Sequence, residues 1–258
     1  MNKEGWISEA IKREEEAHLN FFGRKFSLSS FKEKLKKYDI NQIKEWQNIG
    51  LEPHFLPRTL MMADNNYPGW KVKPEQWFYN QVIDGKLFRN IKGGLKRILT
   101  IGLDGDTVLI DTRLKPEYND GKQMWNNDNL LGQIITSLRS SGDIDKYEHV
   151  PQSSRFGVSS NEWEKSIKPA VAIKLGLNIE QIRLETTVER NAIPQIYSHM
   201  PRKGDGLTST WVWVEEYFEG SGHRLLGGYS GKDGLMYVFR YGVGHHWRNG
   251  SFRPLVVV

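Results

Sequence analysis

Few side chains in this 258-residue chain have the types and spacing that catalysis would need. Cysteine is absent, which excludes disulfides, thiolate zinc sites and a cysteine nucleophile. No serine-nucleophile elbow and no phosphate-binding P-loop occurs in the sequence. The carboxylates Glu215, Glu216 and Glu219 lie in or just after a predicted strand, where structural or solvated roles are favoured over acid/base work. We therefore predict a protein that is not an enzyme and that needs no cofactor.

Two pairs of side chains could suggest a metal site. Asp104 and Asp106 resemble the start of a calcium loop, but the further spaced ligands and the distal glutamate of an EF-hand are missing. His245 and His246 are adjacent, and neighbouring residues of a strand point to opposite faces, so one ion could not readily take both. We predict no metal site from either pair.

The segment from Tyr229 to Ser251 has the composition of a recognition surface. Aromatic side chains offer a large contact area at a low cost in side-chain entropy, and Gly, Ser and Asn add adaptable hydrogen bonding. Alternate residues would share one face of an extended strand, namely Tyr237, Phe239, Tyr241, Val243 and His245. The even positions include poor core residues, so we do not expect the even face to be the buried one: Arg240, Gly242, Gly244 and His246. How far the odd face is open, or packs into the protein's own core, is not decided by the pattern.

The charge balance suggests a nucleic-acid partner only weakly. The chain has a net charge of +5, and clustered lysine and arginine bind phosphates. The excess is concentrated in residues 32–37 and 92–97, where cations alternate with apolar residues. This spacing favours the solvated face of an ordinary element, so nucleic acid is not the expected partner.

Membrane and export signals are missing from the sequence. No apolar run approaches the roughly 20 residues of a spanning helix, and no signal-peptide run follows the first basic residues. We expect a soluble protein without a membrane span. Its location is left open, with a virion or a cell surface as candidates.

Hydrophobic spacing predicts a mostly helical N-terminal region followed by mixed structure. Helices are predicted over residues 3–20, 29–37, 41–48, 74–83, 128–138 and 160–175. The last begins at a capping box of Ser159 and Glu162 and contains Pro169, where it either kinks or restarts. Strands are predicted over residues 97–101 and 107–111, joined as a hairpin, and over 182–188 and 211–218, with loop at 193–207. Three tryptophans are predicted to be core: Trp163, Trp211 and Trp213.

Three phrases then occur in a recognisable order. Residues 155–164 read RFGVSSNEWE, TWVW at 210–213 is followed by RLLGGYS at 224–230, and residues 251–254 read SFRP. Together they resemble the branch of the C-type lectin fold that includes formylglycine-generating enzymes and the variable proteins of diversity-generating retroelements. The cysteines that bind copper in those enzymes are absent here, so that oxidation chemistry is excluded.

The resemblance implies an α+β chain in two parts. A C-type lectin-like domain would cover residues 96–258, preceded by a mostly helical region, residues 1–95, whose role the sequence does not predict. Residues 225–253 would form the variable ligand-binding region.

The resemblance also sorts the positions of that region. Retroelement variable proteins are diversified at Asn codons ending in a pyrimidine, which cannot yield Lys, Met or Trp. Lys232, Met236 and Trp247 are therefore expected to be fixed framework. The positions permitted to vary, and expected to bind ligand, are Tyr229, Ser230, Asp233, Tyr237, Phe239, Arg240, Tyr241, Val243, His245, His246, Arg248, Asn249 and Ser251.

The leading hypothesis is thus a non-enzymatic protein that displays a diversified, aromatic-rich surface on a C-type lectin-like scaffold. The resemblance implies a microbial or viral source and a ligand that is more often a protein than a carbohydrate. Two alternatives stay open: an enzyme of the same fold with non-cysteine chemistry, and a basic nucleic-acid-binding protein that works through the N-terminal region.

Overall fold

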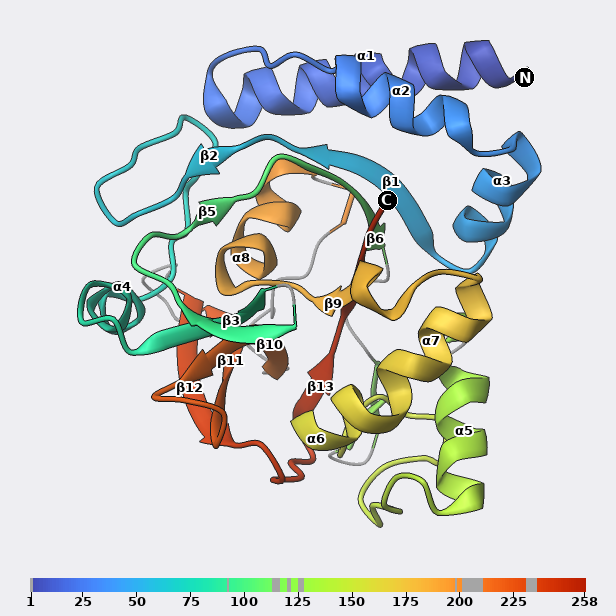
Figure 1. Ribbon diagram of the computed structural model, residues 1–258, viewed down its shortest axis with the longest axis vertical. Helices are drawn as coiled ribbons and strands as arrows, with labels where there is room; N and C mark the ends of the chain where they lie inside the picture. Colours follow the sequence, from blue (N-terminus) through green and yellow to red (C-terminus); the bar gives the residue numbers. More distant parts are fainter. Residues whose placement is uncertain are drawn as a thin grey trace.

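Two β-sheets frame this mixed α+β molecule (Figure 1). The computed structural model describes residues 2–91, 93–112, 117–119, 122–124, 128–197, 199–200, 211–230 and 236–258. The first sheet has four strands, in the order β1 (Leu51–Leu56), β6 (Asp106–Asp111), β14 (Pro254–Val257) and β9 (Ile182–Leu184). All its pairings are antiparallel, and the C-terminal strand β14 lies between β6 and β9.

The second sheet has six strands and carries the segment that the sequence marks as a recognition surface. Its order is β12 (Met236–Gly242), β11 (His223–Ser230), β10 (Trp211–Phe218), β3 (Leu87–Ile91) and β4 (Gly94–Arg97). The sixth strand, β13 (Gly250–Phe252), pairs in parallel with β10. Two further pairs are short: β2 (Thr59–Leu60) with β5 (Gly102–Leu103), and β7 (Glu117–Asn119) with β8 (Lys122–Met124). β12 therefore lies at an edge of the second sheet.

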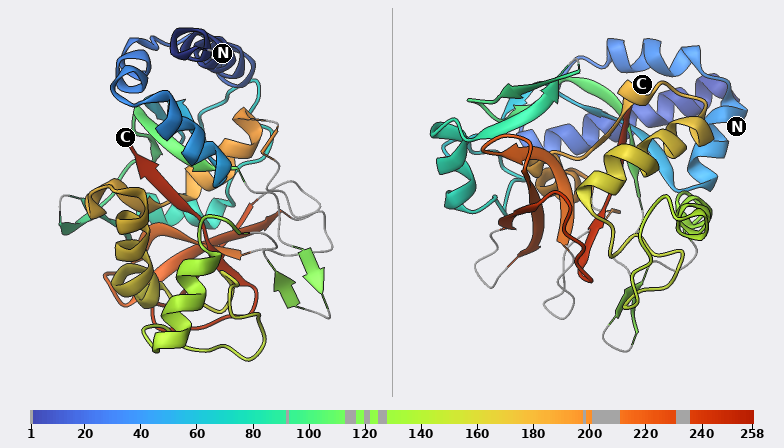
Figure 2. Two further views of the ribbon diagram at one scale, coloured as in Figure 1. Left: turned by 90° about the vertical axis from the view of Figure 1, so that its right-hand side faces the viewer. Right: turned by 60° about the horizontal axis from the view of Figure 1, so that its bottom comes forward.

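The N-terminal helices lie along one side of the molecule, beside β1 (Figures 1 and 2). They are α1 (Lys3–Phe22), α2 (Ser29–Lys37) and α3 (Ile40–Asn48), and α4 (Gln76–Ile83) follows. The later helices are α5 (Gly132–Ser141), α6 (Ser160–Glu162), the π-helix η1 (Trp163–Ile167), α7 (Lys168–Leu175), the 3-10 helix η2 (Ile179–Gln181) and α8 (Thr187–Ile196). The predicted helices of the first 83 residues are confirmed within a few residues.

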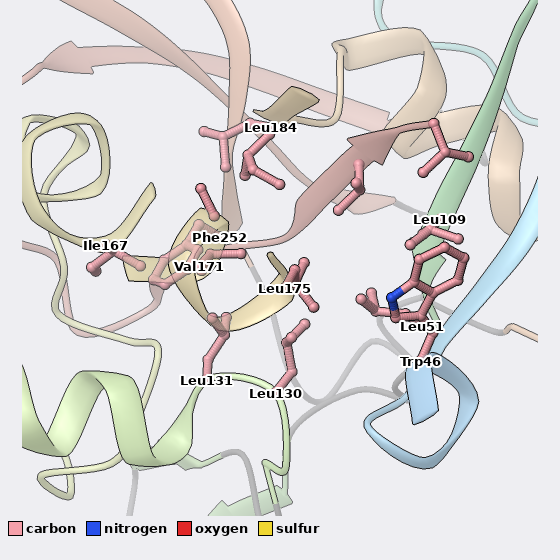
Figure 3. Packing of buried hydrophobic residues seen from close by; sticks show 14 of the residues in the cluster. Trp46, Leu51, Leu109, Leu130, Leu131, Ile167, Val171, Leu175, Leu184 and Phe252 are labelled. Atoms are coloured by element: carbon pink, nitrogen blue, oxygen red, sulfur yellow. The ribbon is translucent and has the colours of Figure 1, made fainter. Parts of the chain in front are cut away.

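Residues before and after position 95 share both sheets and both apolar cores. β1 pairs with β6, and β3 pairs with β10, so each sheet joins the two segments that the sequence separates. Figure 3 shows one core, in which Trp46 and Leu51 pack in the same cluster as Leu109, Leu175 and Phe252. The N-terminal helices therefore contribute core side chains to the same body that carries the second sheet.

The helix that starts near residue 160 has the predicted capping box. The Ser159 hydroxyl accepts from the Glu162 amide at 3.3 Å, and the Glu162 carboxylate accepts from the Ser159 amide at 2.7 Å. The prediction that this helix kinks or restarts at Pro169 is met only by a change of helix type: the backbone stays helical through Ile167 and Lys168, and the Lys168 amide donates to the Trp163 carbonyl in a π-turn directly before the proline. Pro169 then lies in the first turn of α7 and has no N–H to donate.

The predicted hairpin of residues 97–101 and 107–111 is wrong. β6 pairs with β1 and β14, and the preceding short strand β5 pairs with β2. Gly105 has φ of 90°, a left-handed conformation, and it directs the chain from one pairing to the other. The turn residues were correctly recognised, but turn chemistry does not specify which strands pair across it.

The predictions for residues 182–207 are wrong in part. β9 ends at Leu184, and Thr186 caps α8 by accepting from the Glu189 amide at 3.2 Å. α8 then continues through Pro194 to Ile196, where loop was expected. Pro194 stands two residues before Ile196, the last residue of the helix, so only the last turn loses a hydrogen bond. Residues 201–207 lie outside the described part of the chain.

The helix predicted from residue 128 begins later, at Gly132. The Asp128 carboxylate accepts from the Leu131 amide at 3.0 Å and also from the Arg155 guanidinium at 3.0 Å. The Asp128 carbonyl also accepts from the Gly132 amide at 2.9 Å, so Asp128 has the hydrogen bonds of a helix cap, and residues 129–131 form a turn before α5. The predicted apolar face is confirmed at Leu130, Leu131 and Ile135, which are buried.

Within the described residues, every helix is either too short or too polar to cross a lipid bilayer.

The buried Glu216 makes fold stability depend on pH. Its carboxylate accepts from the Thr187 amide at 2.9 Å and from the Thr187 hydroxyl at 3.1 Å. Burial raises the pKa of Glu216 from 4.5 to about 7, against the opposing effects of Arg89 and the Thr187 donors. The folded state then holds a proton that the unfolded chain has lost, so the stability due to this group falls as the pH rises through that window.

We predict that wild-type protein, relative to Glu216→Gln, loses about 3 kcal/mol of unfolding free energy between pH 4.5 and pH 8. Urea unfolding at several pH values measures this difference. The matched control is Glu219→Gln, since Glu219 lies just after the same strand and is exposed. Parallel stability curves for wild type and Glu216→Gln would contradict the assignment.

Candidate ligand-binding surface

The strand β12 has one buried face and one exposed face. Met236 and Val238 are each 3% exposed, whereas Tyr237 is 37% and Phe239 is 52% exposed. The odd face of the strand is therefore the open one. The expectation that the even face would not be buried is wrong for these residues, because it rested on positions from Arg240 onward, which lie beyond the buried part of the strand.

A continuous row of aromatic rings runs from this face toward β10 and the turn after β12; Phe239 meets Trp211 edge to face, and the later rings are stacked. The ring centroids of Phe239 and Trp211 are 5.2 Å apart, and those of Trp211 and Trp247 are 5.7 Å apart. Trp247 stacks on Tyr241 at 5.3 Å, and Tyr241 stacks on His245 at 4.6 Å. Such ring pairs prefer offset or edge-to-face contact and stabilise each other beyond their buried area. The row therefore presents partly exposed aromatic rings that are already ordered.

The turn that follows β12 is held by backbone contacts with the scaffold. The Val243 amide donates to the Gly222 carbonyl at 3.1 Å, and the Asn161 amide donates to the Val243 carbonyl at 2.9 Å. The Trp211 amide donates to the Asn249 carbonyl at 3.0 Å. These contacts use main-chain atoms, so they do not depend on the identity of the side chains at positions 243 and 249.

His246 contacts the scaffold through its side chain instead. Its Nε2 lies 2.8 Å from a Glu162 carboxylate oxygen and 3.6 Å from an Asp145 oxygen. The hydrogen bond with Glu162 raises the pKa of His246 above its ordinary value. His245 and His246 therefore face different surroundings, as their adjacent positions predict.

A shallow hollow of about 440 Å³ adjoins the exposed face of β12. Phe239, Arg240 and Trp77 line it, and the Arg240 guanidinium lies 4.6 Å from the centroid of the Phe218 ring. Aromatic and arginine side chains are the types that contribute most to protein interfaces. The hollow extends the aromatic row around the sheet edge.

The structure brings most of the predicted ligand-binding positions to one region. Those with exposed or half-buried side chains are Tyr237, Phe239, Arg240, Tyr241, Val243, His245, His246, Arg248 and Asn249. Ser251 is fully buried in β13, so it lies beneath the surface and not on it. The backbone of Tyr229 and Ser230 belongs to β11, but their side chains lie outside what is described, as do Asp233 and Lys232. Of the expected framework, Met236 is buried and Trp247 is half-buried within the aromatic row.

A buried arginine supports the strands beneath this surface, and in the sequence it stands out only as the first residue of the phrase RLLGGYS. Arg224 in β11 has no exposed surface, and its guanidinium donates to Glu215 at 2.8 Å and to Glu164 at 2.6 Å. It also donates to the Val214 carbonyl at 2.5 Å and lies 4.6 Å from the Tyr217 ring centroid. These contacts tie β11 to β10 and to the π-helix. Glu215 and Glu216 therefore have the structural roles that were expected of them.

A second buried arginine joins strand β6 to the segments that precede α5 and α6. Arg155 has no exposed surface and donates to Asp128 at 2.5 Å and to Asp111. Arg253, which follows β13, also lies 3.8 Å from the Asp111 carboxylate. Buried charges are tolerated only when they are paired and hydrogen-bonded, so this cluster fixes β6, β13 and the segment before α6 relative to one another.

Comparisons of this chain with family models, with curated proteins and with solved structures find no match.

We predict that Arg224→Met lowers the free energy of unfolding by about 3 to 5 kcal/mol, because it leaves Glu215 and Glu164 without their cation in a buried site. Denaturant unfolding measures the change. Arg240→Met is the matched control: Arg240 is exposed and rests on one aromatic ring, an interaction of about 0.5 to 1 kcal/mol. A loss for Arg224→Met no larger than that of the control would contradict the role assigned to Arg224.

Proposed function

We propose that this chain is a non-enzymatic recognition protein with a C-type lectin-like scaffold, whose surface around β12 binds a ligand and is diversified by a retroelement. The observation that carries the proposal is the row of partly exposed rings on β12 and the following turn, fixed to a scaffold of buried ion pairs. We expect the ligand to be a protein, with a carbohydrate as the less favoured alternative.

The meeting of the three phrases supports the proposed scaffold. The Trp213 indole donates to the Val158 carbonyl at 2.9 Å, which joins the second phrase to the first. The Gly157 amide donates to the Gly250 carbonyl at 3.2 Å, and the rings of Trp163 and Phe252 lie 5.0 Å apart, which joins the first phrase to the third. Residues up to about 100 positions apart in sequence thus build one framework, as the resemblance would require.

The separation of framework and surface supports the proposed diversification. Where their side chains are described, the positions that the codon rule permits to vary are exposed or half-buried in this region, apart from the buried Ser251, whereas the expected framework residue Met236 is buried. The turn from residue 243 to 249 is held through its backbone. Substitutions there would change the surface chemistry while leaving the main hydrogen bonds in place.

Ordered aromatic side chains support a protein ligand. Tyr, Trp and Arg dominate the binding energy of protein interfaces when they lie at the centre of a contact. Rings that are stacked before binding lose little side-chain freedom on contact, which favours affinity. Phe239 in the row and Tyr237 on the same face of β12 have exposed aromatic side chains and are the expected anchors.

We predict that the surface tolerates variation that the adjacent buried face does not. A display library with positions 237, 239, 245 and 248 randomised should keep most clones folded, because surface changes cost roughly 0.5 kcal/mol or less. The matched library randomises the buried residues Leu225, Leu226, Met236 and Val238, and most of its clones should unfold. The measurement is the fraction of clones that resist protease.

Single variants refine this test. The free energies of unfolding of Phe239→Ala and Tyr237→Ala should lie within about 1 kcal/mol of that of wild type, whereas Met236→Ala should lower it by about 2 to 5 kcal/mol. If both libraries lost their fold equally, the residues of the odd face would be core, and the proposed binding surface would be abandoned.

A further inference from the structure

A constellation of two histidines and a glutamate lies away from the aromatic surface. Glu52 and His54 are two residues apart in β1, and His199 follows α8. The His199 Nε2 lies 3.0 Å from a Glu52 carboxylate oxygen, and the His54 Nε2 lies 3.2 Å from the same oxygen. One donor atom from each residue lies within 4.8 Å of the other two. β1 borders the N-terminal helices in Figure 1, whereas the aromatic row belongs to β12 and the turn after it.

A buried carboxylate orients the central histidine. The His54 Nδ1 lies 2.8 Å from a Glu14 oxygen, and both side chains are fully buried. Glu14 is itself held by the Tyr197 hydroxyl at 2.6 Å and by the Phe55 amide at 3.2 Å. With Nδ1–H donating to the Glu14 carboxylate, the Nε2 atom is the one that lies toward Glu52 and His199. A carboxylate behind a histidine is the usual support of a metal-binding imidazole.

We propose that the Glu52 carboxylate, His54 Nε2 and His199 Nε2 bind one divalent cation of the zinc class, with a coordination position left open to water. Two imidazoles and one carboxylate are a donor set that zinc accepts, with bonds of about 2.0 to 2.2 Å. Tetrahedral bonds of that length place donors roughly 3.3 Å apart, close to the separations of 3.0 and 3.2 Å seen here. The His199 side chain is 47% exposed, so an ion can enter from solvent.

Arg13 is a neighbouring cation that opposes the ion. Its guanidinium lies 3.9 Å from the Glu52 carboxylate and 3.5 Å from Glu14, and it donates to the Pro53 carbonyl at 3.0 Å. Its side chain is 34% exposed, which allows it to swing away when an ion binds. Arg13 therefore competes with the cation for Glu52, and its removal should strengthen binding.

A second group of possible ligands, Asp145, Glu162 and His246, is less suited to an ion. Both oxygens of Glu162 are already used, because they accept from the Asp145 amide at 2.6 Å and from the Ser159 amide and hydroxyl. An ion there would have to break the capping box of α6. Substitution of His246 in this group therefore serves as a control for the zinc titration.

The test is calorimetric titration of the full chain with zinc chloride at neutral pH. Wild type is expected to bind one ion. His199→Ala should weaken binding by more than the roughly 10- to 100-fold that loss of a second-shell partner causes, since it removes a ligand. Arg13→Ala should bind zinc more tightly than wild type. His149→Ala is the matched control, because His149 is 48% exposed and contacts its near neighbours in sequence, the Glu148 carboxylate and the Tyr147 ring.

Cobalt in place of zinc provides an independent readout, since a four-coordinate ion should give a visible absorption band that His199→Ala removes. Circular dichroism confirms that each variant is folded, and His199, being half exposed, is a safer position than the buried His54. The proposal is overturned if wild type shows no saturable site, if His199→Ala and His149→Ala bind zinc equally well, or if His246→Ala abolishes binding instead.

Discussion

A buried guanidinium that must satisfy its donors is the constraint on which the rest of this structure depends. Arg224 contacts Glu215, Glu164 and the Val214 carbonyl, so it can be charged in the interior only if β10, β11 and the π-helix keep their mutual positions. Arg155 imposes the same requirement on Asp111 and Asp128 at the other sheet. Each ion pair contributes little net stability compared with an apolar core, but breaking one leaves an unpaired charge in the interior. The scaffold is thereby limited to one arrangement.

That limitation separates the part of the molecule that holds its shape from the part that meets solvent. Beneath β12 the residues are buried and apolar, while its odd face and the following turn carry rings in mutual contact. Main-chain hydrogen bonds hold the turn at Val243 and Asn249, while His246 and Trp247 contact the scaffold through their side chains. A surface of this kind can change composition at a low cost in stability, because most of its side chains are not the groups that satisfy the interior. The proposed recognition function uses that property.

Local sequence signals predicted many of the helices and strands, but the sequence did not predict which distant segments pair with one another. The capping box at Ser159 and the alternation of Tyr237 and Phe239 are visible within a few residues, and the structure contains both. The hairpin around Gly105 failed because strand partners are chosen by contacts far along the chain. Buried charges such as Arg224 also escaped prediction, since hydropathy assigns arginine to the surface and its partners lie in three separate elements. The same holds for His54 and His199: the spacing of Glu52 and His54 was a usable signal, but Glu14 and His199 are joined to them only by the fold.

Whether a fixed scaffold displays positions that change sequence is tested by sequencing this locus in many members of the source population. We expect variation to be concentrated at the exposed positions from 237 to 249, and Arg224, Met236 and Trp247 to stay constant. We also expect a reverse transcriptase gene and an imperfect repeat of the last hundred or so bases nearby. Variation spread evenly along the gene, with no repeat beside it, would contradict diversification of this surface.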